Sequence, residues 1–478
     1  MSATDLKALL PLLIVTITAV LAMLMVAIRR QHRATAALAF AGLATAFVSL
    51  WIAASSAPHV VAPLLTIDRY ALFYMGLIFA ASMVFVLLSY DYFSKLEGDH
   101  DELYIVMLVA TLGSSVLVAS THLVSLFLGL ELLSVPLYVM VSYPRTRALP
   151  VEAGLKYLVL AAVSAAFLLF GIALIYAAVG SMELSRLATA LSIREQLDLR
   201  LILPGMVLLV TGLGFKLALV PFHLWTPDVY EGAPAPVTAY IATVSKGATL
   251  GVLLRFFHAT QVLSIPSILL VFWLIAMASM LAGNLLALLQ PNIKRMLAYS
   301  SIAHLGYALV AFQAGGDLGP SAVTFYLAAY FVTILGAFGV ISVLSNSEGE
   351  RAAIEDYRGL FWHRPAIAAI FTAMLFSLAG IPLTAGFIGK FYVVAAGASS
   401  AIWSLLIVLV VTSAIGLFYY LRVVVAMYGR AEERYEPEPR LRPIPNLLLA
   451  GLTVFLLWLG LLPGTFLRLI RDAVGGLS

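Results

Sequence analysis

Fourteen long apolar segments follow one another along this 478-residue chain. Each is long enough to cross a hydrocarbon layer of about 30 Å as an α-helix, which rises about 1.5 Å per residue. The regular apolar–polar alternation of barrel strands is absent, and helices are the remaining way to satisfy the backbone in lipid. We therefore predict an all-α polytopic membrane protein. The predicted helices cover residues 6–28, 35–55, 69–90, 103–119, 121–142, 153–179, 201–223, 238–258, 266–289, 296–313, 321–345, 365–395, 400–428 and 444–466.

Composition narrows the class of function. Hydrophobic residues make up 62% of the chain and charged residues 11%, with a mean hydropathy of +1.03, whereas soluble domains are about 25% charged. There is no cysteine, which excludes disulfides, thiolate metal sites, iron–sulfur clusters and thioether-linked haem. Any electron transfer is therefore expected in a partner chain. The net charge of +4 reflects loop bias in a membrane protein rather than nucleic-acid binding.

The distribution of lysine and arginine predicts the orientation of the chain. Loops after odd-numbered helices carry 16 of these residues, whereas the other side, which includes both termini, carries 8. The positive-inside rule then places both termini outside the cytoplasm. The 16 are Arg29, Arg30, Arg33, Lys95, Arg145, Arg147, Lys156, Lys294, Arg295, Arg351, Arg358, Arg364, Arg430, Arg434, Arg440 and Arg442. The 8 are Lys7, Arg69, Arg186, Arg194, Arg200, Arg255, Arg468 and Arg471.

Four ionisable residues lie well inside the predicted helices: Glu131, Lys216, Lys246 and Lys390. Such a group costs several kcal/mol in a bilayer and usually faces protein or water and has a function. Burial and a neighbouring cation favour a neutral amine, and a nearby carboxylate restores its charge. A chain of amines can therefore relay protons. The alternative is that these groups form structural ion pairs, but three bases cannot all be neutralised by one acid. A fifth residue, Arg422, lies near a helix end and is expected to extend to the interface.

The magnitudes permit such a relay to pump. Moving one charge against about 150 mV costs about 3.5 kcal/mol. A charge pair at 4 Å interacts by about 4 kcal/mol at an effective dielectric constant of about 20. One ion pair that forms and breaks is therefore sufficient to move a proton against the membrane potential.

Helix-breaking residues accompany two of the lysines. Pro221 removes the hydrogen bond to the carbonyl of Leu217, so the seventh helix should break one turn beyond Lys216. In the twelfth helix, Lys390 follows a stretch that should unwind. Discontinuous helices at corresponding positions of two halves mark transporter pathways. The residues that crowd this stretch are Gly380, Pro382, Gly386 and Gly389.

The order of these features suggests an internal repeat within a single transmembrane domain. Residues 103–260 and 265–428 each hold five predicted helices, and an odd number per copy forces opposite orientations of the two copies. The broken helices 7 and 12 would then correspond. The first three helices, within residues 1–100, and the last helix, 444–466, complete the domain.

Two histidines extend the candidate relay. His304 lies in the helix that would correspond to the one carrying Glu131, and we predict that it passes protons. His223 lies seven residues after Lys216, two helical turns along the same face, and is a further candidate. For both, a hydrogen-bonded packing role is the alternative. Lys294 and Arg295 are expected to be interfacial anchors rather than buried charges.

Five ordered motifs carry a resemblance to a known family. They are GLELLSVPLYVM, EAGLKYLVLAAVSAAFLLFG, GFKLALVPFHLWTPDVYEGAPAPVTAYIATVSKGA, NIKRMLAYSSIAHLGYALV and GIPLTAGFIGKFYV. Together they resemble the antiporter-like membrane subunits of respiratory complex I over residues 100–430. A lysine on helix 12 is similar to the N-type branch, because the M-type carries a glutamate there. The absence of a long lateral helix after helix 14 speaks against the L-type.

The resemblance implies a function and partners. It implies a proton-translocating subunit of an NADH:quinone oxidoreductase in a bacterial inner membrane, with proton transfer through Glu131, Lys216, Lys246 and Lys390. It also implies K-type and M-type neighbours, the lateral helix of an L-type subunit, and a peripheral arm that holds FMN and iron–sulfur clusters. No cofactor or metal is expected in this chain. A sodium/proton antiporter subunit remains the main alternative; a structural scaffold and a membrane-bound redox enzyme are weaker ones, the last because the chain has no cofactor motif.

Overall fold

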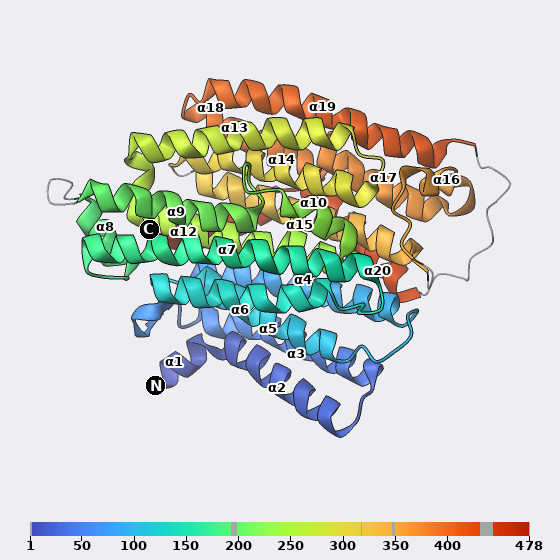
Figure 1. Ribbon diagram of the computed structural model, residues 1–478, viewed down its shortest axis with the longest axis horizontal. Coiled ribbons are helices and arrows are strands. Elements are labelled where there is room, and N and C mark those ends of the chain that lie inside the picture. Colours follow the sequence, from blue (N-terminus) through green and yellow to red (C-terminus); the bar gives the residue numbers. More distant parts are fainter. Residues whose placement is uncertain (1, 193–197, 317, 347–348, 431–442, 478) are drawn as a thin grey trace.

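The helices of this protein run side by side in one bundle (Figure 1). The computed structural model describes residues 2–192, 198–316, 318–346, 349–430 and 443–477. The first helix and the last described turn lie at the same end of the bundle, as an even number of membrane crossings requires. Four arginines that entered the orientation prediction lie outside the described residues: Arg194, Arg434, Arg440 and Arg442.

The described residues contain 12 candidate spans that are long and apolar enough to cross a membrane. The remaining two predicted spans are α14 (Ile293–Ala314) and the pair formed by α17 (Pro365–Ala379) and α18 (Ala385–Ser399). The prediction of an all-α polytopic membrane protein is therefore confirmed. The 12 spans are α2 (Leu10–Ile28), α3 (His32–Ala54), α4 (Arg69–Phe93), α5 (Glu102–Ala119), α6 (Leu123–Val141), α7 (Ala148–Val179), α9 (Leu199–Leu217), α11 to α12 (Ala235–Thr260), α13 (Pro266–Leu288), α15 (Leu318–Leu344), α19 (Trp403–Tyr428) and α20 (Pro443–Leu461).

Short elements connect or extend these spans. They are α1 (Ala3–Ala8), β1 (His59–Val61), η1 (Ala62–Leu64), β2 (Leu65–Ile67), α8 (Leu184–Ser192), α10 (Trp225–Gly232), η4 (Val262–Ser264), η5 (Ile354–Tyr357), α16 (Leu360–His363), α21 (Gly464–Val474) and η6 (Gly475–Leu477). The span from Ala235 to Thr260 consists of α11 (Ala235–Tyr240), a π-helical turn η3 (Ile241–Ser245) and α12 (Lys246–Thr260).

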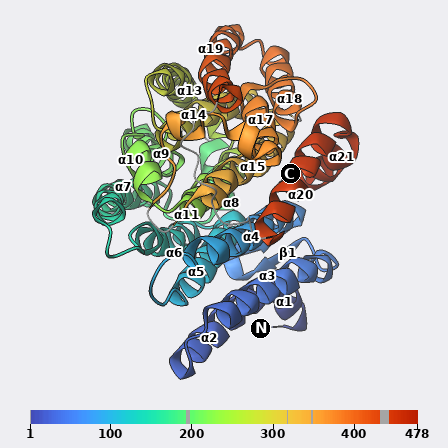
Figure 2. The ribbon, with the colours of Figure 1, turned by 90° about the vertical axis from the view of Figure 1, so that its right-hand side faces the viewer.

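Two spans form the core of the bundle. In the apolar 18-residue stretches of α15 and of the segment from α11 to α12, every residue is buried. In the corresponding stretches of α2 and α20, 33% and 22% of the residues are buried. The two core spans contact each other, and viewed along the bundle α2, α3 and α20 lie on the outside (Figure 2). A helix that is hydrophobic on all sides can be covered either by lipid or by other helices, and here other helices cover both spans. Polar residues on the core spans therefore face protein rather than lipid.

Helix seven is broken, but earlier than the sequence predicts. The helix α9 ends at Leu217, directly after Lys216, because Ala218 adopts a left-handed conformation with φ of 60°. The N–H of Ala218 donates to the carbonyl of Phe215 at 2.9 Å, which satisfies a carbonyl at the helix end. The missing N–H of Pro221 marks the region of the break but does not locate it. Because the helix stops here, the prediction that His223 continues the face of Lys216 is wrong.

Helix twelve is also broken. The helix α17 ends at Ala379, Gly380 takes a φ of 82°, and α18 begins at Ala385. Gly386, predicted to unwind, is helical. A Cβ there would lie 1.9 Å from the carbonyl oxygen of Ser377, so glycine allows the two halves to pack closely.

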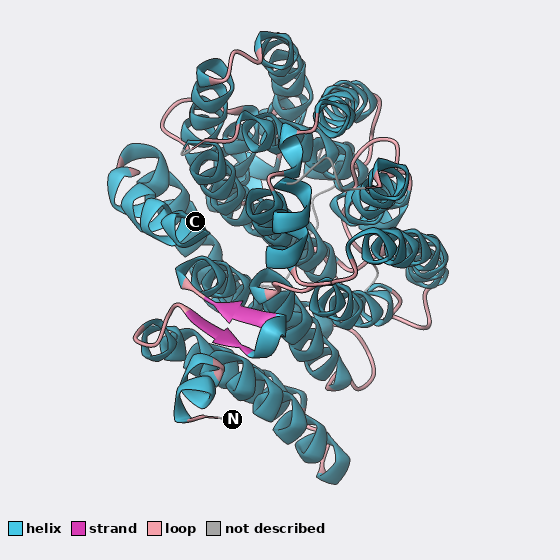
Figure 3. Cartoon of the chain, turned by 90° about the vertical axis from the view of Figure 1, so that its left-hand side faces the viewer, coloured by secondary structure: helices cyan, strands magenta, loops and turns pink. Residues whose placement is uncertain are grey.

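The connection between α3 and α4 contains structure that the sequence did not predict. Strands β1 and β2 form an antiparallel hairpin in which His59 lies opposite Ile67, at the same end of the bundle as the N-terminus (Figure 3). The His59 Nε2 lies 2.7 Å from Asp5 of α1, and this hydrogen bond lowers the pKa of Asp5 to about 2. The short α8 and α21 are amphipathic, with Leu187 and Ile470 among the residues that they bury.

A buried ion pair ties the start of α4 to α12. Both terminal nitrogens of Arg255 bond the carboxylate of Asp68, at 2.7 and 2.8 Å, and the two side chains are 6% and 5% exposed. Removing one partner of such a pair leaves an uncompensated buried charge. We expect Arg255→Met to reduce the free energy of unfolding by about 3–5 kcal/mol, measured in detergent. The control, Arg30→Met, removes exposed pairs with Asp99 and Glu102 and should cost at most about 1 kcal/mol; equal losses would contradict the prediction.

Candidate functional site

Lys216 lies in the last turn of α9 and is 2% exposed. Its Nζ donates to the hydroxyls of Ser134 on α6, at 2.8 Å, and of Tyr157 on α7, at 3.0 Å. The amine also lies 5.2 Å from the centroid of the Tyr157 ring. Neutral oxygens and an aromatic face thus hold this lysine, and an amine held in this way keeps its contacts in either protonation state better than one locked to a carboxylate.

Glu131 lies one turn before Ser134 on α6, so both side chains occupy the same face. It is half-buried, and its charge interacts with that of Lys216. Lys216 bonds Ser134 on this helix and therefore approaches the face of α6 that carries Glu131.

Lys246 is the first residue of α12, directly after the π-helical turn, and is completely buried. Single π-helical turns often occur at functional sites because the extra residue redirects the following side chains. The Nζ of Lys246 donates to the hydroxyl of Ser301 on α14 at 2.6 Å and lies 5.3 Å from the ring centroid of Tyr230. The hydroxyl of Tyr330 also donates to Ser301, at 2.6 Å.

His304 lies one turn after Ser301 on α14 and is 4% exposed. Its Nδ1 is 2.6 Å from the hydroxyl of Tyr326, and its Nε2 is 3.2 Å from that of Tyr420. Because a neutral imidazole has one donor and one acceptor nitrogen, the two tyrosines fix its orientation in either tautomer. His304 lies one turn after Ser301, which bonds Lys246, and one turn before Tyr307, whose ring faces Lys390, so it lies between the two amines along α14.

Lys390 lies in the second turn of α18 and is partly buried. Its Nζ donates to the carbonyl of Ala379, the last residue of α17, at 2.8 Å and to the hydroxyl of Ser413 at 2.6 Å. It also lies 5.3 Å from the ring centroid of Tyr307, one turn after His304. The amine therefore bridges the break in helix twelve, where a cation interacts favourably with the C-terminal end of a helix.

His223 stands apart from this arrangement. It lies in the connection between α9 and α10 and is 9% exposed. Its Nδ1 is buried without a hydrogen-bond partner among the described residues. The structure thus gathers Lys246, His304 and Lys390 around α14 and bonds Lys216 to the helix that carries Glu131. We call these five residues the row. Among the described residues, no hydrogen bond links the sixth candidate, His223, to any of them.

The hydroxyl groups of the site were not predicted from the sequence. A hydroxyl both donates and accepts, so it can pass a proton between two basic groups. One signal was present: Ser301, His304 and Tyr307 follow one another at intervals of three residues, which places them on one face of a helix. The hydroxyl residues in contact with the row are Ser134, Tyr157, Ser301, Tyr326, Tyr330, Ser413 and Tyr420.

The broken helices and the buried amines define an antiporter-like membrane subunit. The family model described as "NADH:quinone oxidoreductase/Mrp antiporter, TM" matches residues 120–416. NADH-quinone oxidoreductase subunit N of Ectopseudomonas mendocina is 47% identical over 99% of this chain and 97% of its own. Subunit N of Nitrosospira multiformis is 49% identical over the same shares. The chain belongs to the subunit N family of NADH-quinone oxidoreductases.

Solved structures of similar fold include subunits of three respiratory or antiporter complexes. A chain of respiratory complex I from Thermus thermophilus is 34% identical, with a TM-score of 0.83, over 97% of this chain and 99% of that chain. A chain of the Mrp complex from Dietzia sp. is 20% identical, with a TM-score of 0.88, over 100% and 98%. A chain of an archaeal membrane-bound sulfane sulfur reductase is 24% identical, with a TM-score of 0.87, over 99% and 98%. The last two similarities concern the fold alone.

Proposed function

We propose that this chain translocates protons as a membrane subunit of NADH-quinone oxidoreductase, driven by quinone reduction elsewhere in the complex. One observation carries the proposal. Lys216, Lys246 and Lys390 each donate to hydroxyl or carbonyl oxygens, and none forms an ion pair with another described residue. An uncompensated ammonium is costly in a membrane interior, so each amine is poised to exchange its proton with a neighbour.

The row suggests the order of the steps. Glu131 and Lys216 form the first pair, and Lys246 follows, with its Nζ bonded to Ser301. From there His304 leads to Lys390. His304 lies on α14 between Ser301, the partner of Lys246, and Tyr307, whose ring faces Lys390, and a proton on either amine opposes a proton on the imidazole because like charges repel. Protons would then move along the row because successive groups are protonated and deprotonated in turn.

The partners and location follow from the family. We propose that the chain assembles with K-type and M-type membrane subunits and the lateral helix of an L-type subunit, in a bacterial inner membrane with both termini outside the cytoplasm. FMN and iron–sulfur clusters would be held by the peripheral arm. Among the described residues, no group of three or more His, Asp or Glu is arranged to hold a metal ion.

The proposal is tested in the assembled complex, reconstituted into liposomes and supplied with NADH and quinone. We expect proton translocation in sodium-free buffer. We expect Glu131→Gln to reduce it about tenfold or more, within the range of a lost proton-transfer group, while NADH oxidation by a water-soluble artificial acceptor is unchanged.

The control variant is Glu97→Gln, an exposed acid in the loop before α5, which should translocate protons at the wild-type rate. Transport that strictly requires sodium would instead support a sodium/proton antiporter. Full proton translocation by assembled Glu131→Gln would exclude this carboxylate from the pathway.

A further inference from the structure

The short helix α10 is the second half of broken helix seven. Residues 218–224 separate it from α9, so no continuous helical hydrogen bonding holds it in line with Lys216. It packs between α7 and α14. Its position therefore depends on side-chain contacts with these neighbours.

The first end of α10 is attached to the surroundings of Lys216. Trp225 stacks on Tyr157, with ring centroids 4.5 Å apart and an interplanar angle of 11°. Its Nε1 donates to the carbonyl of Phe215 at 2.9 Å. Because Tyr157 is a hydroxyl partner of Lys216, a displacement of α10 would move that partner.

The middle of α10 contributes to the surroundings of Lys246. The face of the Tyr230 ring lies 5.3 Å from Lys246 Nζ, and the Tyr230 hydroxyl is 3.4 Å from that of Ser301. One short helix thus contacts the partners of two successive amines, Lys216 and Lys246. These two amines come from different spans, α9 and α12, and α10 is a structural link between them.

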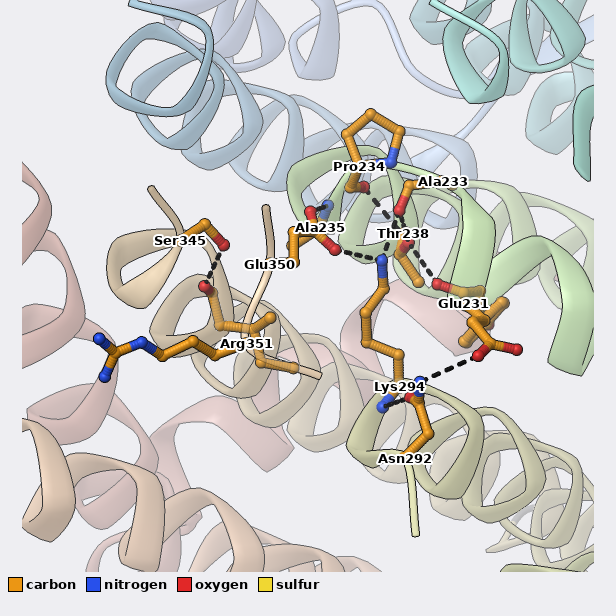
Figure 4. Close-up of polar contacts among 12 residues, drawn as sticks. Glu231, Ala233, Pro234, Ala235, Thr238, Asn292, Lys294, Ser345, Glu350 and Arg351 are labelled. Carbon is orange, nitrogen blue, oxygen red and sulfur yellow. Dashed lines mark hydrogen bonds and ion pairs between the residues drawn. The ribbon is translucent and has the colours of Figure 1, made fainter. Parts of the chain in front are cut away.

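Five charged residues, which we call the ionic clasp, meet at the far end of α10: Asp228, Glu231, Lys294, Arg295 and Glu350. Lys156 on α7 also bonds Asp228, at 2.9 Å. Arg295, on α14, bonds Asp228 at 2.8 Å and Glu231 at 2.7 Å. Lys294 Nζ donates to the carbonyl of Ala233, at the end of α10, at 2.6 Å and also bonds Glu350. Glu350 accepts from the N–H of Ala235, the first residue of α11, at 2.7 Å (Figure 4).

The charges of the clasp complement the dipoles of the neighbouring helices as well as one another. The cation Lys294 lies at a helix C-terminus, and the anion Glu350 lies at a helix N-terminus, which is the arrangement that the helix dipoles favour. Lys294 is 1% exposed and Glu350 11%, so the expectation that Lys294 is an interfacial anchor is wrong. A buried pair is expensive to desolvate and contributes little net stability. Its benefit here is a fixed geometry at the corner between α10 and α11.

We propose that the ionic clasp is a positioning device for proton transfer. By pinning α10 to the start of α14, it keeps Tyr157 at Lys216 and Tyr230 at Lys246 at the same time. The clasp residues touch neither amine and act through α10. The inference rests on the proposed function, because it assigns these residues a role in the same pathway.

The experiment compares Arg295→Met with Arg295→Lys in the assembled complex. A misplacement of about 1 Å can cost on the order of 10²-fold in rate, so we expect Arg295→Met to reduce proton translocation per assembled complex at least about tenfold. The solvent deuterium isotope effect on NADH–quinone activity should rise, because proton transfer becomes limiting. Arg295→Lys keeps the charge and should restore most of the rate. The matched control is Arg30→Met, which removes an exposed ion pair.

A second substitution tests the geometry. Exchanging the pair, by Lys294→Glu with Glu350→Lys, keeps both charges but places an anion at the carbonyl of Ala233 and a cation at the N–H of Ala235. We expect the complex with the exchanged pair to translocate protons well below the wild-type rate. If the exchanged pair works as well as the wild type, the clasp is a simple ion pair and the proposal is wrong.

The outcomes separate this inference from the proposed function. An Arg295→Met complex that translocates protons at full rate, alongside an inactive Lys216→Met complex, overturns the clasp alone. Active Lys216→Met overturns the relay itself. If Arg295→Met lowers only the amount of assembled complex, the same measurement is made on Glu231→Gln, because glutamine has nearly the same shape as glutamate. A wild-type rate and a wild-type isotope effect in Glu231→Gln would also overturn the clasp.

Discussion

Replacing Lys216 with methionine is expected to abolish proton translocation by the assembled complex and to slow coupled quinone reduction. Methionine fills a similar volume in the buried site but carries no proton, and it cannot donate to Ser134 or Tyr157. The row would be interrupted between Glu131 and the rest of the relay. We expect a rate below about a tenth of the wild type, consistent with the loss of a proton-transfer group. The measurement is proton uptake per NADH oxidised in liposomes, normalised to assembled complex.

The interaction between Lys216 and Glu131 gives this prediction a second test. If both act in one step, the double variant Glu131→Gln/Lys216→Met should be no worse than Lys216→Met alone, because groups that act as a unit are strongly non-additive. Lys7→Met, at an exposed position in α1, controls for losses during purification and assembly of a variant complex. Independent, multiplying losses would show that the two residues act in separate steps.

The spans were predictable because lipid imposes one requirement on all of them. An apolar run of about twenty residues is both necessary and sufficient for a transmembrane helix in most cases, and the predicted runs correspond to the observed helices. The ends of helices are less determined. Local rules for proline and glycine indicated that helices seven and twelve break, and the observed helix ends lie at left-handed Ala218 and Gly380.

The site was predictable only where a residue is costly in lipid. Glu131 and the three lysines stand out because a charge in an apolar run requires an explanation. Ser301 and Tyr330 carry no such signal, since a hydroxyl on a helix can bond its own backbone. Whether it instead meets an amine depends on which helices pack together. The burial of Lys294 also depends on tertiary packing, because its partner Glu350 lies 56 positions further along the chain.

Replacing Lys246 with arginine is expected to stop proton translocation as completely as replacing it with methionine. Arginine keeps the positive charge and the ability to donate to Ser301, but its guanidinium stays protonated under all relevant conditions. A relay needs a group that releases its proton, so both variants should fall below about a tenth of the wild-type rate. The measurement is proton uptake per NADH oxidised, with quinone reduction followed in parallel.

The comparison distinguishes titration from scaffolding at this position. Lys246 is completely buried and has no carboxylate partner among the described residues, so a purely structural lysine here would serve only through its charge and hydrogen bond. In that case arginine would be tolerated and methionine would not. Thr249→Ala one turn later, which removes a methyl group and a hydroxyl bonded to its own helix, reports the cost of disturbing the packing of α12. A complex that carries Lys246→Arg and pumps at the wild-type rate would show that the proton does not pass through this amine.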